Sequence, residues 1–167
     1  MVIEKIEEKL GYTFSNKQFL ERALTRKAYA LEKRQKNQYC EDQEVYRTLG
    51  DAVLKAILVD LLIKRGCKTR DEITRKKMFL EREETLARIS GELGVGEFIK
   101  LGAGEKKHKL DEEPKVLAET LEAIIGAIYF DGGYNTSQEV VNKWFKKLIF
   151  NEGDSGKIFL NKTRRDY

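Results

Sequence analysis

The chain has 167 residues and a net charge of +4, with 36% charged and 41% hydrophobic residues. This length predicts one domain, and the apolar content suffices for a packed core, which excludes a disordered or fibrous protein. Two cysteines and one histidine argue against a disulfide framework and a zinc finger. The acidic N-terminal residues argue against an export signal, and no apolar run is long enough to cross a membrane. We therefore expect a cytoplasmic protein.

Apolar residues recur at helical spacing along the chain, and no strand pattern competes with this periodicity. Ser15 and Gln18 form a capping-box start, and the Gly132-Gly133 pair is a natural helix end. The spacing predicts helices over residues 3–10, 15–24, 43–64, 71–80, 84–93, 114–132 and 137–150, and a short amphipathic turn over 97–101. We expect an all-α fold of about seven or more helices.

Two acidic clusters lie on otherwise apolar helices. Glu44 and Asp51 are two helical turns apart with Arg47 between them, so all three share one helix edge. Glu119 and Glu122 project from one face of a second helix. Carboxylates beside an apolar face are costly to bury unless paired, hydrogen-bonded or bound to a cation, and oxygen-rich clusters suit Mg²⁺ or Mn²⁺. The clusters indicate either a metal site or the solvent edge of two amphipathic helices.

The residues around both clusters resemble the two signature motifs of the ribonuclease III catalytic domain. Residues 43–54, QEVYRTLGDAVL, are similar to the first motif, usually NERLEFLGDAVL. Residues 116–129, VLAETLEAIIGAIY, are similar to the second motif, usually ILADTFEAIIGAIY. The stretch LGYTFSNKQFLERALT near the start also matches the family, so the resemblance covers about residues 3–150. It implies an all-helical nuclease domain, which we assign to residues 1–152.

The resemblance implies a metal-dependent endoribonuclease that hydrolyses phosphodiester bonds of double-stranded or structured RNA as a homodimer. In the family pattern Asp51 and Glu122 are the catalytic pair, Asp51, Glu119 and Glu122 bind Mg²⁺ or Mn²⁺, and Glu44 is a supporting acid. No small-molecule cofactor and no membrane partner are expected. The basic C-terminal tail, residues 153–167, leaves no room for a double-stranded-RNA-binding domain, and in this the chain is similar to the Mini-III type.

Several positions depart from the family pattern. Arg47 stands in the place of a metal-contacting glutamate. Because it lies four residues before Asp51 on the same predicted helix, we expect it to pair with the Asp51 carboxylate. Glu119 replaces an aspartate, and Thr48 replaces a phenylalanine that inserts into the partner subunit. These departures support a second hypothesis, a weakened or inactive module that binds structured RNA or assembles with partners. A third, a di-iron bundle, lacks the expected pair of Glu-x-x-His motifs.

Residues 64–82 hold eight basic and three acidic residues, a balance of +5. Such a cluster fits a duplex-binding surface, because phosphate neutralisation supplies most non-specific affinity for nucleic acid. A charged run of this kind also serves simply to keep a helix soluble. The candidate RNA-binding residues are Lys68, Arg70, Arg75, Lys76 and Lys77.

Overall fold

The computed structural model describes residues 2–150, so the proposed basic tail, residues 153–167, lies outside the described residues. The helices are α1 (Val2–Leu10), α2 (Lys17–Ala23), α3 (Lys27–Gln35), α4 (Glu44–Lys64), α5 (Arg70–Glu81), α6 (Glu83–Glu92), α7 (Ala103–Lys107) and α8 (Pro114–Phe150), with 3₁₀ turns η1 (Gly96–Phe98) and η2 (Leu110–Glu112). In this range the one extended pairing is an isolated bridge between Thr25 and Lys100. The predicted all-α fold is confirmed. Within 2–150, no helix combines the length and apolar character needed to span a bilayer.

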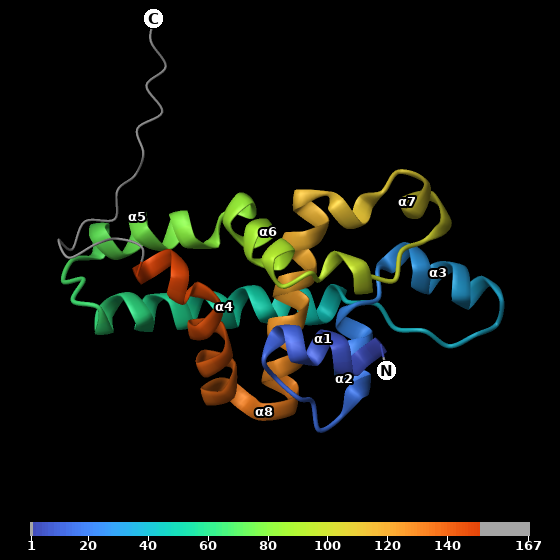
Figure 1. Cartoon of the computed structure of the whole chain (residues 1–167), viewed down its shortest axis with the longest axis horizontal. Coiled ribbons are helices and arrows are strands. Elements are labelled where there is room, and N and C mark those ends of the chain that lie inside the picture. The colour runs from blue at the N-terminus through green and yellow to red at the C-terminus, as the bar shows by residue number, and fades with distance from the viewer. Residues whose placement is uncertain (1, 151–167) are drawn as a thin grey trace, which may run out of the picture.

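Helices α4 and α8 form the centre of the molecule, and α8 passes across α4 in Figure 1. The α5 helix lies alongside α4, while α6 and α2 pack against α8. Gly133 interrupts α8 with φ 78° and ψ −177°, a backbone conformation open to glycine. The predicted break at Gly132-Gly133 is therefore confirmed, and it lets the C-terminal part of α8 return to the core.

The backbones of α4 and α8 touch where they cross. A Cβ atom on Gly50 would overlap the carbonyl oxygen of Glu122, and a Cβ atom on Gly126 would overlap the carbonyl oxygen of Tyr46. Each helix thus offers one glycine to the other helix's backbone. Because this contact is so close, side chains that flank it on the two helices are brought near each other.

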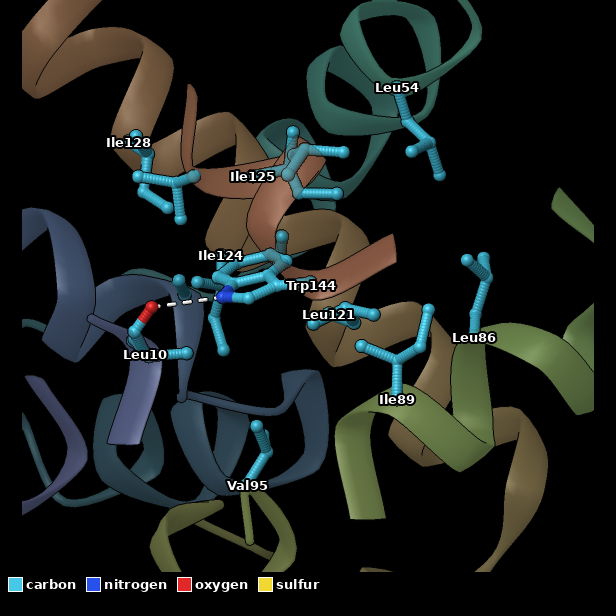
Figure 2. Packing of buried hydrophobic residues seen from close by; sticks show 14 of the residues in the cluster. Leu10, Leu54, Leu86, Ile89, Val95, Leu121, Ile124, Ile125, Ile128 and Trp144 are labelled. Atoms are coloured by element: carbon cyan, nitrogen blue, oxygen red, sulfur yellow. Dashed lines mark hydrogen bonds between the residues drawn. The ribbon is translucent and has the colours of Figure 1, made fainter. Parts of the chain in front are cut away.

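A tryptophan ties the C-terminal part of α8 to the rest of the core. The Trp144 indole N–H donates to the carbonyl of Leu10 at 2.9 Å, as Figure 2 shows. The ring packs among apolar side chains of α6 and the first part of α8, including Ile89, Leu121 and Ile124. The core therefore holds the break in α8 in one geometry and fixes the first part of α8 against α4.

Two predicted helix starts differ from the structure. The α2 helix is capped by Asn16, whose side chain accepts the N–H of Gln18 at 3.0 Å, and not by Ser15. The reason is tertiary, because the backbone N–H groups of Ser15 and Asn16 both donate to the Asp131 carboxylate of α8, at 2.8 and 2.9 Å. The α5 helix is likewise capped by Thr69, two residues before the predicted start.

The α3 helix was not expected from the sequence. Four of its nine residues carry long charged side chains, and Ala30 is the one that is fully buried. A helix with so narrow an apolar face gives little periodic signal. Its N-cap residue, Arg26, nevertheless proves central to the candidate site.

Candidate active site

The crossing of α4 and α8 places Asp51 beside Glu122. Asp51 follows Gly50 on α4 with its side chain 41% exposed, while Glu122, on the turn of α8 that meets Gly50, is half-buried. Burial, then the charge of Asp51 and more weakly that of Glu119, raise the pKa of Glu122 to about 7 against the opposing charges of Arg47 and Lys55. Two neighbouring carboxylates repel each other when both are ionised, so a cation bound beside them would stabilise the charged forms.

The cationic partner of Asp51 is Lys55. Its ammonium nitrogen lies 2.7 Å from Asp51 Oδ2, one helical turn further along α4, and this contact raises the pKa of Lys55. The prediction that Arg47 pairs with Asp51 is therefore wrong, although the i, i+4 spacing of Asp51 and Lys55 carried the signal for the actual pair. Both side chains are more than two-fifths exposed, and an exposed pair of this kind is weak. A divalent cation can therefore displace Lys55 from Asp51.

Arg47 reaches from α4 to α8 instead. Its Nη1 lies 2.7 Å from Glu119 Oε1, and its Nη2 lies 3.7 Å from Glu44 Oε2 on the preceding turn of α4. The Arg47 side chain is long enough to reach from α4 to α8, so its guanidinium pairs with Glu119. Asp51 pairs with Lys55 instead. The predicted supporting acid, Glu44, thus contacts Arg47.

Arg26 occupies the second oxygen of Glu119, a contact that sequence reasoning missed. Its Nη1 donates to Glu119 Oε2 at 2.8 Å and its Nε donates to Glu105 Oε1 at 3.2 Å. The Gln43 amide, oriented to satisfy its neighbours, accepts from the same Nη1 at 3.1 Å. Arg26 and Glu119 are 93 positions apart in the sequence, so no local spacing could have indicated the pair.

Two carboxylates at the crossing, Asp51 and Glu122, are not bound by an arginine among the described residues. Within residues 2–150, no three Asp, Glu, His or Cys side chains come together in an arrangement that would hold a metal ion. Glu119 has both oxygens on arginines, whereas Glu122 forms no ion pair in the described part of the chain. Mg²⁺ is commonly held by one or two carboxylates, with waters and substrate phosphate completing its octahedron. The residues present fit such a site through Asp51 and Glu122.

Two candidate RNA-binding residues are already engaged on α5. The Lys76 ammonium lies 2.7 Å from Glu72 Oε1, and the Lys77 ammonium lies 2.8 Å from Glu81 Oε1. Both lysines are largely buried against their partners. Their charges are therefore compensated locally and contribute less to the surface potential than the sequence count indicates.

The other three candidates, Lys68, Arg70 and Arg75, are exposed, and the described residues provide no ion-pair partner for them. Arg70 and Arg75 lie on one side of α5, where they line an open groove together with Asp71, Thr74 and Met78. A positive groove on an exposed helix suits a phosphate backbone. Among the candidate residues, the cations without an ion-pair partner in the described chain are therefore Lys68, Arg70 and Arg75.

Fold and site together define an all-α domain whose two crossing central helices present a carboxylate pair at the surface. The ribonuclease-III-like family model matches residues 16–149, so the chain belongs to that family and the resemblance of its two motifs is confirmed.

Relatives and solved structures agree with this assignment. The chain is 33% identical over 150 residues to Ribonuclease 3 of Glaesserella parasuis serovar 5, covering 89% of this chain and 63% of that protein. It is 36% identical over 143 residues to Ribonuclease 3 of Pseudomonas putida strain GB-1, covering 85% of this chain and 58% of the relative. The chain thus spans about three fifths of these relatives.

A solved nuclease domain of ribonuclease III from Campylobacter jejuni has a similar fold. It superposes with a TM-score of 0.78 at 29% identity, covering 87% of this chain and 96% of that chain. That structure was described for flexibility in its region involved in dimer formation. The chain therefore matches nearly the whole of that solved nuclease domain.

Proposed function

We propose that this chain is an endoribonuclease that hydrolyses phosphodiester bonds of double-stranded or structured RNA and requires Mg²⁺ or Mn²⁺. The observation that carries the proposal is the pairing of Asp51 with Glu122, a half-buried carboxylate of raised pKa, at the α4–α8 crossing. The supporting comparison is with relatives named Ribonuclease 3.

Asp51 and Glu122 would hold the ion, and their different exposures suit different tasks. Asp51 is exposed and would reach the ion once Lys55 has moved aside, while Glu122 is fixed by the helix crossing and would bind the ion as the deprotonated carboxylate. When bound, the ion supplies Lewis-acid activation of water and neutralises charge on the phosphate. This chemistry does not require a histidine or an activated serine.

The substrate and assembly follow from the surface and the family. Exposed cations at the start of α5 would contact phosphates, and A-form RNA would be recognised by its shape and 2′-hydroxyl groups and not by base edges. A homodimer would place two carboxylate sites on opposite strands of one duplex. Free thiols at Cys40 and Cys67 fit a reducing cytoplasm.

A second candidate function is an RNA-binding or assembly module without cleavage. The Arg47–Glu119 ion pair favours this function. Arg47 engages one carboxylate of the motif and places a positive charge beside the site. An arginine beside carboxylates weakens cation binding by Coulomb repulsion.

One assay separates the two functions. Purified protein is incubated with long duplex RNA in Mg²⁺ or Mn²⁺, beside Glu122→Gln, which keeps the side-chain shape but removes the charge. We expect metal-dependent cutting by the wild type that is lost in the variant, with RNA binding retained in a mobility-shift assay. Binding without cutting by the wild type would instead establish the second function.

A further inference from the structure

Glu119 lies in the family's metal-binding motif, and each of its two carboxylate oxygens is bound by an arginine. Arg47 Nη1 holds Oε1 at 2.7 Å and Arg26 Nη1 holds Oε2 at 2.8 Å. Two guanidinium groups on opposite oxygens of one carboxylate form charge-assisted hydrogen bonds, which are the strongest class in proteins. A metal ion bound to this carboxylate would lie beside both guanidinium charges, and their Coulomb repulsion opposes its binding.

Arg26 is fixed by more than Glu119. Its side chain is 16% exposed, and it also contacts Glu105 on α7 and, through Nη1, the buried Gln43 at the N-cap of α4. A charge held by three partners from different elements is not free to leave, because its departure would leave the largely buried Glu105 carboxylate uncompensated. Arg26 therefore keeps Glu119 Oε2 engaged.

Arg47 is the more accessible of the two arginines, with 32% of its side chain exposed. It lies one helical turn before Asp51, and its contact with Glu44 is long, 3.7 Å. A guanidinium carries five N–H donors, so Arg47 retains donors for a phosphate while Nη1 stays on Glu119. A charge fixed in this way meets RNA without further reorganisation.

Building on the proposed function, we propose that Glu119 is a positioning residue and not a metal ligand. Arg26 and Glu119 hold Arg47 beside the Asp51–Glu122 pair, the divalent ion is bound by those two carboxylates alone, and the Arg47 guanidinium contacts the RNA phosphate. The arginine that replaces an acid in the motif thus supplies a fixed positive charge where the family pattern has another ligand.

Calorimetric titration of Mn²⁺ into the RNA-free protein at pH 8 tests the ligand assignment. Asp51→Asn and Glu122→Gln are expected to weaken Mn²⁺ binding by about tenfold or more, and Glu119→Gln by about threefold at most. Arg47→Gln frees Glu119 Oε1 and should tighten binding by about fivefold, a gain that Arg47→Gln/Glu119→Gln should abolish. Circular dichroism checks that each variant is folded.

The outcomes distinguish this inference from the proposed function. If Asp51→Asn and Glu122→Gln leave Mn²⁺ affinity unchanged, the metal site of the proposed function is wrong. If those variants act as expected but Glu119→Gln weakens binding equally, or Arg47→Gln does not tighten it, the positioning role of Glu119 is wrong while the metal site stands.

RNA binding in a chelator tests the role of Arg47 without any metal. Arg47→Gln is expected to weaken binding of duplex RNA by about threefold, and Arg47→Lys, which keeps the charge, should restore most of the affinity. Arg88→Gln removes the same charge from an exposed position on α6 and is the matched control. Equal losses in Arg47→Gln and Arg88→Gln would show that Arg47 does not contact the phosphate.

Discussion

At the scale of single residues, the site is organised by how each carboxylate is compensated. Asp51 has an exposed lysine that can leave, Glu119 has two arginines, and Glu122 has no ion-pair partner among the described residues. Three acids of one motif thus differ in availability although they share the same charge. The partner of Asp51 lies on its own helix, whereas both partners of Glu119 lie on other elements. Glu122, which lacks such a partner, is the acid whose pKa is raised to about 7.

The metal-free protein should lose stability as the pH rises through 7 because of Glu122. Its pKa is about 7 in the folded chain and 4.5 ordinarily, so the folded state holds the extra proton between these values. The contribution is fully present below pH 4.5 and lost above 7, and is about 1 kcal/mol after allowance for partial solvent screening. Urea unfolding in a chelator should show Glu122→Gln gaining that amount on the wild type between pH 5 and 8. A pH-independent difference would contradict the assignment.

At the scale of elements, the site depends on two helices that touch backbone to backbone. Gly50 and Gly126 permit the contact, and each costs helix propensity to do so. Glycine inside a strongly helical pattern usually has a packing reason, and here that reason is the approach that sets Asp51 against Glu122. The core around Trp144 then holds α8 in place.

Gly50→Ala should destabilise the fold by about 3 kcal/mol or more, since the added methyl group meets the backbone of α8 and not a movable side chain. Gly91→Ala, in α6 with open space around the position, should instead stabilise by about 0.5 kcal/mol. Chemical denaturation of both variants measures the difference. Similar stabilities for the two would mean that α4 and α8 do not cross in close contact.

At the scale of the whole molecule, the proposed RNA binding and the proposed assembly also involve surfaces away from the crossing. The start of α5 offers uncompensated cations, whereas further along the helix the lysines are neutralised by glutamates. Thr48 is exposed on α4, at the position where the family pattern has an aromatic residue that inserts into the partner. Both surfaces yield predictions that can be measured on the intact chain.

Arg70→Ala/Arg75→Ala should lower the slope of log affinity against log salt by about two, because each phosphate contact releases about one counterion. Lys76→Ala/Lys77→Ala is the matched control of equal formal charge, and its slope should change by less because both lysines are already paired. Fluorescence anisotropy with duplex RNA at several salt concentrations provides the measurement. A larger change in the lysine variant would place the RNA elsewhere.

Thr48→Phe should strengthen the proposed homodimer by about tenfold, because it restores an aromatic anchor of the kind that dominates interface energetics. Thr74→Phe, at another exposed threonine on α5, controls for a general increase in hydrophobicity. Analytical ultracentrifugation gives both dissociation constants. If the two variants self-associate equally, Thr48 lies outside the interface.

The sequence alone determined the helical class, the break in α8 and the family, because helix periodicity, a glycine pair and two motifs are local signals. It also predicted Asp51 and Glu122 as the catalytic acids, because both stand at motif positions. The narrow apolar face of α3 gave too weak a signal, and the Asp131 contacts moved the start of α2.

Only the tertiary structure decided how the acids are paired. Arg26 and Glu119 are distant in sequence and meet only through the packing of α3 against α7 and of α8 against α4. Arg47 had a sequence neighbour at pairing distance, Asp51, yet the crossing offered it Glu119 instead. Ion pairing depends on distance in space and on competition among partners. Helix spacing in the sequence indicates only those partners that lie on the same helix.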